Sequence, residues 1–172
     1  MSQLIVQHGR PLRGQVQVPG DKSISHRALI LGAIANGVSQ VEGFLPAGDC
    51  LATLHTIQSL GIQVERPGPT SLVIKGRGLR GLREPEDVLN CGRSGTTLRL
   101  LAGVLAGQPF TSVLSGEGQL RRRPMQRVVE PLRTMGATIL GREDGHLPPL
   151  AIQGRALTGI EYSLPVASAQ VK

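Results

Sequence analysis

The sequence predicts an α/β protein assembled from repeated units of β-α-β-α-β-β type. Stretches with apolar residues at helical spacing alternate with short strand-like stretches, and Gly and Pro residues separate them. The same order then returns: SHRALILGAIANGVSQVEGF matches TTLRLLAGVLAGQPFTSVLSG, and HTIQSLGIQVE matches EPLRTMGATIL. A period of roughly 70 to 75 residues exceeds that of solenoid repeats, so each copy is expected to be a subdomain.

The composition indicates a folded, basic protein with an anionic partner. The 172 residues are 40% hydrophobic with a mean hydropathy of +0.00, which is enough apolar material for a buried core. A net charge of +7 and a pI near 10.7 favour a negatively charged ligand. Aromatic residues make up 2%, so side chains that stack on nucleic-acid bases are nearly absent. A small phosphorylated or carboxylated substrate is therefore favoured over nucleic acid.

Neither the cysteines nor the histidines indicate a metal site. Cys50 and Cys91 lack metal-type spacing, and the histidines are scattered along the chain. The sequence shows no signal peptide and no apolar run of membrane-spanning length. We therefore expect a reducing, cytoplasmic location, no membrane partner and no structural metal.

The first unit is expected to follow two short strands within residues 4–20. Its first helix begins near Ser23 or Ser25, where a hydroxyl group can cap free backbone N–H groups. Asp49 is expected to be the N-cap of the second helix. A strand, this second helix and a hairpin complete the unit at residues 38–46, 47–61 and 62–78.

The second unit repeats this order. A helix, a strand, a helix and a hairpin are expected at residues 90–107, 109–118, 123–136 and 137–154. Pro124 fits the first turn of the second of these helices, where a missing N–H does no harm. A third copy opens at YSLPVASAQVK and stops at Lys172, where its helix would begin. We therefore expect the chain to be a fragment of a longer protein, or one piece of a split one.

Three helix starts share a chemical character that suits an anion. Each combines small or hydroxyl-bearing residues with a cation: KSISHR at 22–27, GRSGTT at 92–97 and SAQVK at 168–172. Free N–H groups and the helix dipole already favour an anion at such positions. We expect the three helix starts to converge on one anionic ligand. The alternative is that the repeats simply inherit capping chemistry, with the cations on the surface.

Two further features at helix starts indicate a ligand. A glycine inside a helix start costs stability relative to alanine, so Gly95 indicates close approach of a ligand or of backbone; a looser cap is the alternative. Residues 121–123 are three arginines before a helix, where the dipole disfavours cations. A bound anion would explain them, and a solvated charge run is the alternative, least so for Arg123. Asp49 is interpreted as a cap rather than an acid or base, and His26 receives no chemical role.

The motifs PGDKSISHRA, SGTTLRLLAG, RRRPM and SAQVK closely resemble the 5-enolpyruvylshikimate-3-phosphate synthase family, from about Leu4 to the end. This resemblance implies an inverse α/β barrel with two domains of three βαβαββ units each, closing on substrate at their interface. Residues 1–18 would be leading strands at the inter-domain edge, and residues 19–172 an incomplete N-terminal domain. Its units would span about 19–85 and 86–157, with the third opening at 158–172 and the C-terminal domain absent.

The resemblance also implies a reaction. The carboxyvinyl group of phosphoenolpyruvate is transferred to the 5-hydroxyl of shikimate 3-phosphate, through a tetrahedral intermediate and without metal or organic cofactor, and phosphate is released. The family's acid/base carboxylate and further cations lie in the other domain. Because catalysis needs both halves at once, we expect this chain to be inactive without a complementing C-terminal domain or fragment.

The resemblance assigns roles to residues of the first two helix starts and of the arginine run. Lys22 would be catalytic, contacting phosphoenolpyruvate beside the reacting hydroxyl. Ser23 and Arg27 would hold the carboxylate and hydroxyls of shikimate. Gly95 and Arg123 would line the phosphoenolpyruvate site, where the planar fork of an arginine suits a carboxylate or phosphate.

The third helix start and two distinctive positions complete the expected site. Ser168 and Ala169 would bind the phosphate of shikimate 3-phosphate, and Gln170 would bridge the two ligands. The family usually has Asn where Arg93 stands, so this arginine either adds phosphate affinity or disturbs the loop. A glycine rather than an alanine at Gly95 predicts sensitivity to glyphosate.

Three other interpretations stay open. The related enolpyruvyl transferase acting on UDP-N-acetylglucosamine typically has Lys-Asn where this chain has Lys22-Ser23, and Arg27 also disfavours it. A non-enzymatic basic module for RNA or DNA would show steeply salt-dependent binding, and the paucity of aromatic residues argues against it. The third is a folding or assembly fragment whose anion sites are incomplete.

Overall fold

The computed structural model describes residues 3–5, 9, 11 and 13–164. Its first unit consists of α1 (Lys22–Ile34), β1 (Asn36–Val41), α2 (Gly48–Ser59), β2 (Gln63–Gly68) and β3 (Ser71–Arg77). The strands form an antiparallel sheet in the order β1-β3-β2, and α1 packs against both α2 and β3. The predicted order of helix, strand, helix and hairpin is confirmed.

The second unit repeats this arrangement. It consists of β4 (Leu89–Asn90), α3 (Gly95–Ala106), β5 (Thr111–Ser115), the short 3₁₀ helix η1 (Leu120–Arg122), α4 (Gln126–Thr134), β6 (Thr138–Gly141), α5 (Arg142–Gly145) and β7 (Leu147–Gln153). Three of its strands adopt the order β5-β7-β6, which matches β1-β3-β2, and β4 joins them parallel to β5. This shared order confirms the internal repeat.

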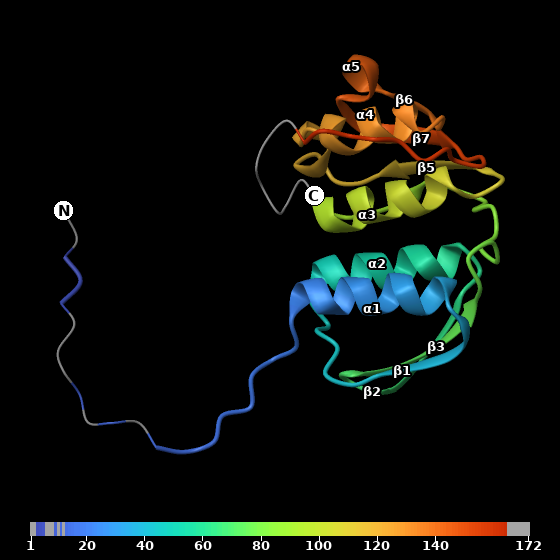
Figure 1. The fold of residues 1–172 in the computed structure, drawn as a ribbon. Coiled ribbons are helices and arrows are strands. Elements are labelled where there is room, and N and C mark those ends of the chain that lie inside the picture. Colours follow the sequence, from blue (N-terminus) through green and yellow to red (C-terminus); the bar gives the residue numbers. More distant parts are fainter. Residues whose placement is uncertain (1–2, 6–8, 10, 12, 165–172) are drawn as a thin grey trace.

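The helices α1, α2 and α3 lie between the sheets of the two units (Figure 1). These three helices therefore face inward, and the two sheets lie outside them. Aliphatic side chains from both units make one core between these layers, among them Leu29, Leu54, Ile74, Leu98, Leu114 and Ile152. Burial of this apolar surface holds the two units together.

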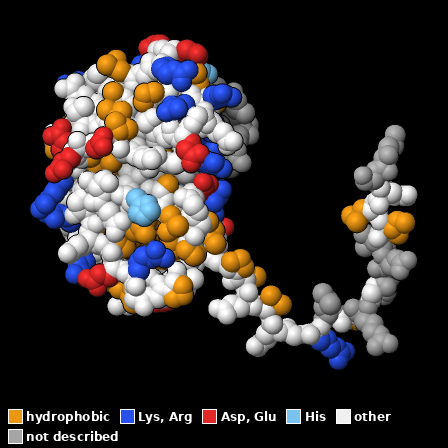
Figure 2. Space-filling view, turned by 180° about the vertical axis from the view of Figure 1, so that it is seen from behind, with side chains coloured by type: hydrophobic (Ala, Val, Ile, Leu, Met, Phe, Trp, Pro, Cys, Tyr) orange, Lys and Arg blue, Asp and Glu red, His pale blue; other side chains and the backbone are white. Residues whose placement is uncertain are grey.

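The predicted strands within residues 4–20 are not formed in the described part of that segment. The segment extends away from the body of the molecule and exposes hydrophobic side chains (Figure 2), with Leu4 and Val16 almost fully solvent-accessible. A strand needs a hydrogen-bonding neighbour, and none of the described strands pairs with this segment. At the corresponding place before α3, β4 does have such a neighbour in β5.

The helix starts differ in detail from the predictions. The N-cap of α1 is Asp21, whose Oδ1 accepts a hydrogen bond from the Ile24 N–H at 2.7 Å. The N-cap of α2 is Ala47, without a side-chain hydrogen bond, so the prediction that Asp49 caps this helix is wrong. Pro124 lies before α4 rather than in its first turn, because η1 occupies the chain just ahead of it.

Two further predictions concern the third helix start and membrane-spanning segments. The third predicted helix start, residues 168–172, lies outside the described residues. None of the helices in the described part combines the length and the apolar composition that crossing a bilayer requires.

Candidate functional site

The first turns of α1 and α3 face a common cleft of about 710 Å³. Among the described residues, five cationic side chains and one carboxylate line it. The lining residues are Lys22, Ser23, Arg27, Asp49, Gly95, Thr96, Arg99, Leu100, Arg123 and Arg127. The structure thus brings together all five predicted site residues that lie in its described part.

At the start of α1, one serine is structural and the other faces the cleft. The buried Ser25 hydroxyl donates to the carbonyl oxygen of Asp21 at 2.8 Å and accepts from the Leu45 N–H at 3.0 Å. These bonds fix the turn that leads into the helix. The side chain of Ser23 is exposed and lines the cleft beside Lys22. Of the two hydroxyls in the motif, Ser23 is therefore the one placed for a ligand.

Asp49 pairs with Lys22 across the cleft instead of capping a helix. The Lys22 ammonium donates to Oδ2 of Asp49 at 3.3 Å, and both side chains are partly exposed. An ion pair this accessible adds little to folding stability. Its main consequence is to orient the ammonium group toward the first turn of α2.

Three arginines at the other side of the cleft have no carboxylate partner in the part of the chain that the structure describes. None of the ion pairs within the described residues involves Arg99, Arg123 or Arg127. Arg99 donates instead to the carbonyl oxygen of Pro124 at 2.8 Å. Its burial, together with the neighbouring charges of Arg127 and Arg123, lowers the pKa of Arg99 to about 10. Uncompensated positive charge of this kind is suited to an incoming anion.

Gly95 allows two of these arginines to lie over the start of α3. A Cβ atom built at this buried residue would lie 2.7 Å from Nη1 of Arg123 and 2.7 Å from Nη1 of Arg99. The N-cap is Ser94, whose hydroxyl accepts from the Thr97 N–H at 3.1 Å. The groups that approach Gly95 closely are therefore the guanidinium groups of Arg99 and Arg123, which could hold a ligand. The alternative of a looser helix cap is not what the structure shows, because Ser94 caps α3.

The other cations of the sequence motifs lie elsewhere. Arg121 and Arg122 belong to η1, are exposed and do not line the cleft, which matches the solvated charge run considered for them. Arg93 pairs with Glu117, with Nε 2.6 Å from Oε2, and does not line the cleft either. The predicted Ser168, Ala169 and Gln170 lie outside the described residues.

Sequence reasoning did not assign a role to Leu100 or Arg127, and it included Thr96 only as part of the second helix start. A signal for one of them exists: Arg127 follows Arg123 by four residues, a spacing that can place two side chains on one face. The cleft-lining role of Asp49 was also missed, because its type and position fit a cap equally well.

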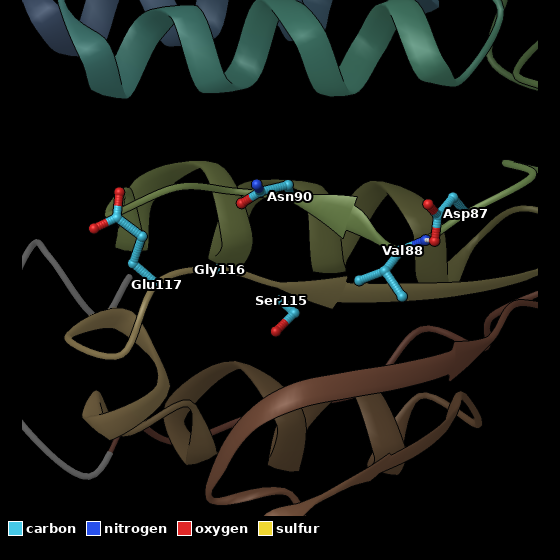
Figure 3. A pocket seen from close by; sticks show the side chains of 6 residues that line it. All are labelled: Asp87, Val88, Asn90, Ser115, Gly116 and Glu117. Carbon is cyan, nitrogen blue, oxygen red and sulfur yellow. Dashed lines mark hydrogen bonds between the residues drawn. The ribbon is translucent and has the colours of Figure 1, made fainter.

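A second pocket, of about 400 Å³, has the opposite chemical character (Figure 3). Asp87, Asn90, Ser115 and Glu117 line it along the ends of β4 and β5, together with Val88 and Gly116. No cation of the described residues lines it. It is therefore unsuited to the anionic ligand that the net charge predicts.

Comparison with known proteins identifies the family. EPSP synthase (3-phosphoshikimate 1-carboxyvinyltransferase) is the family that matches, over residues 6–172. The chain is 58% identical to the 3-phosphoshikimate 1-carboxyvinyltransferase of Chloroflexus aggregans over 172 residues, which are all of this chain and 40% of the relative. It is 60% identical to that of Geobacter sulfurreducens over 163 residues, covering 95% of this chain and 38% of the relative.

A solved structure agrees with these relatives. The EPSP synthase from Acinetobacter baumannii superposes with a TM-score of 0.88 at 48% identity, covering 92% of this chain and 36% of that one. The chain thus spans about two fifths of the length of the relatives it matches. Its two described units have the inverse α/β barrel architecture of enolpyruvyl transferases, as predicted. The chain belongs to the EPSP synthase family.

Proposed function

We propose that the protein containing this chain transfers the carboxyvinyl group of phosphoenolpyruvate to the 5-hydroxyl of shikimate 3-phosphate. The observation that carries the proposal is the cleft, in which five cations and one carboxylate meet at two helix N-termini. Both substrates carry a phosphate and a carboxylate, so they match this excess of positive charge. Membership of the EPSP synthase family supports the choice of these two anions over others.

The chemistry requires addition followed by elimination. The 5-hydroxyl oxygen bonds to C2 of phosphoenolpyruvate while C3 gains a proton and the hydroxyl loses one. The C2–O bond to phosphate then breaks and C3 loses a proton, which restores the double bond and releases phosphate. Lys22 is assigned to the reacting hydroxyl, and its contact with Asp49 would orient it there. Ser23 and Arg27 are assigned to shikimate 3-phosphate.

The arginines of the second unit are assigned to phosphoenolpyruvate. Arg99, Arg123 and Arg127 would neutralise its phosphate and carboxylate as charge develops in the tetrahedral intermediate. Ser168, Ala169 and Gln170 keep the roles predicted from the resemblance. That no cofactor takes part, that the location is cytoplasmic, and that a C-terminal domain completes the site also remain predictions.

A chimera tests this proposal. Residues 1–172 replace the aligned part of the Chloroflexus aggregans relative, and phosphate release is followed with both substrates. We expect turnover that Arg123→Ala reduces strongly and that the matched Arg121→Ala leaves nearly unchanged, because Arg121 is exposed and outside the cleft. The chain alone is expected to show no turnover.

The rival functions predict different results in the same preparation. Turnover with UDP-N-acetylglucosamine in place of shikimate 3-phosphate would favour the related transferase. A steeply salt-dependent gel shift with RNA or DNA, and no phosphate release, would favour the binding module. On the face in Figure 2, acidic side chains are interspersed with basic ones.

A further inference from the structure

Beneath the cleft, a buried hydrogen-bonded chain joins three helices. Nδ1 of His26 in α1 lies 2.7 Å from Oγ1 of Thr53 in α2, which lies 2.7 Å from Oγ1 of Thr97 in α3. All three side chains are completely buried. These contacts therefore link three helices through side chains that are 27 and 44 residues apart in sequence.

The far end of this chain sets the direction of its hydrogen bonds. Oγ1 of Thr97 lies 3.2 Å from the carbonyl oxygen of Asp49. Oγ1 of Thr97 also lies 2.7 Å from Oγ of Ser94, so its single proton can go to Ser94 or to the carbonyl oxygen of Asp49. With that proton on either acceptor, Thr97 accepts from Thr53, and Thr53 accepts from the Nδ1–H of His26. Nε2 finds no acceptor for a second proton within the described residues, which favours the neutral imidazole. Burial favours this form because it lowers the pKa of His26, although the charge of Asp49 acts in the opposite direction.

Both ends of the chain adjoin residues that line the cleft. His26 immediately precedes Arg27 in α1, and Thr97 bonds to the backbone of Asp49, the partner of Lys22. Directional hydrogen bonds between buried side chains add to the packing and specify one arrangement of the helices. A shift of α1 relative to α3 would therefore move cations of the cleft relative to one another, and a shift of α2 would move Asp49 relative to Lys22.

Burying His26 costs folding free energy, because one of its two ring nitrogens lacks a hydrogen-bond partner among the described residues. Nε2 of His26 is buried and has no hydrogen-bond partner within the described residues. An apolar side chain would fill this position without leaving a polar atom unsatisfied. A polar residue nevertheless occupies this position, and its other nitrogen, Nδ1, reaches Thr53 on a neighbouring helix.

We propose that His26 and Thr53 are positioning residues for the candidate site. Their hydrogen bonds hold α1, α2 and α3 at the separation at which one pair of anionic substrates contacts the cations of both units. Neither residue lines the cleft, and both act through the backbone and side chains beside it. This inference rests on the proposed function.

Substitutions of Thr53 in the chimera test the inference. Thr53→Val removes the hydroxyl at nearly constant shape, and Thr53→Ser restores it. The matched control is Thr56→Val, because Thr56 is buried in the same helix and its hydroxyl donates within that helix, to the carbonyl oxygen of Ala52 at 2.7 Å. We expect Thr53→Val to lower kcat/KM about tenfold or more, because small displacements of binding groups are costly. Thr53→Ser should recover most of the loss, and Thr56→Val should change kcat/KM less than about twofold.

Amide hydrogen exchange supplies a readout that does not depend on turnover. In the Thr53→Val chimera, the helix-start amides of Ser25 and Leu98, which bond to the carbonyl oxygens of Asp21 and Ser94, should exchange faster than in Thr56→Val. Equal exchange and equal kcat/KM in the two valine variants would overturn the inference. An unsubstituted chimera without turnover would count against the proposed function alone, and the exchange comparison would still decide whether Thr53 positions the helices.

Discussion

A methyl group at Gly95 should weaken phosphoenolpyruvate binding without unfolding the protein. The new Cβ in Gly95→Ala would lie 2.7 Å from the Nη1 atoms of Arg99 and Arg123, whereas ordinary contacts begin at 3.4 Å. Each guanidinium group must therefore move by about 0.7 Å or more, which it can do because it is the far end of a flexible side chain. Alanine in a helix also adds up to about 1 kcal/mol of stability relative to glycine, so the fold should survive.

The displaced guanidinium groups can no longer meet the anion in their present geometry. Losing one charged hydrogen bond costs about 1.5–3 kcal/mol, which corresponds to a roughly 10- to 150-fold rise in KM for phosphoenolpyruvate. The KM for shikimate 3-phosphate should change much less, because Lys22, Ser23 and Arg27 are on α1. Steady-state kinetics of the chimera with each substrate varied in turn, together with thermal unfolding, measures both effects.

Gly103 provides the matched control for this substitution. It lies in the same helix, and a Cβ built there has no other heavy atom within 4 Å. Gly103→Ala should therefore raise the melting temperature and leave both KM values unchanged. If Gly95→Ala also left the KM for phosphoenolpyruvate unchanged, the assignment of Arg99 and Arg123 to this substrate would be refuted.

Three further predictions follow from the same geometry. The pKa of His26 is lowered below 6.5, so the unfolded state binds more protons and stability falls as pH drops below about 6.5; urea unfolding at pH 7.5 and 5.5 should show this fall, and an equal fall in His26→Asn would contradict it. Because Arg93 pairs with Glu117 outside the cleft, Arg93→Asn should change kcat/KM less than about twofold; a tenfold change would place it in the site. Glyphosate should inhibit the chimera, and an inhibition curve flat to millimolar concentrations would refute that expectation.

The elements could be predicted from the sequence because their signals are local. Apolar periodicity and glycine punctuation locate α1, α3 and the two hairpins, and the repeat confirms each copy by the other. The caps were less predictable, since Asp21, Ser23 and Ser25 all have capping side chains within five residues. Asp21 is the N-cap because the backbone is still extended at this residue and becomes helical at Lys22.

The parts of the site that escaped prediction depend on long-range packing. Arg127 lines the cleft because η1 ends before Arg123 and α4 begins at Gln126; the spacing of four residues from Arg123 is the one local signal for it. The contact of His26 with Thr53 spans 27 residues and involves types that occur as often in ordinary cores. The convergence of the first two predicted helix starts could be predicted because the repeat relates them and a repeat is visible in the sequence; the third start lies outside the described residues.

The cleft lies on the boundary between the two copies of the repeat. The first copy contributes Lys22 and Asp49, and the second contributes Arg99, Arg123 and Arg127. An anion bound there touches both copies, so its binding free energy adds to the free energy that docks one copy on the other. The substrate therefore acts as a non-covalent cross-link within the chain, and occupancy of the site should make two subdomains unfold as a single cooperative block.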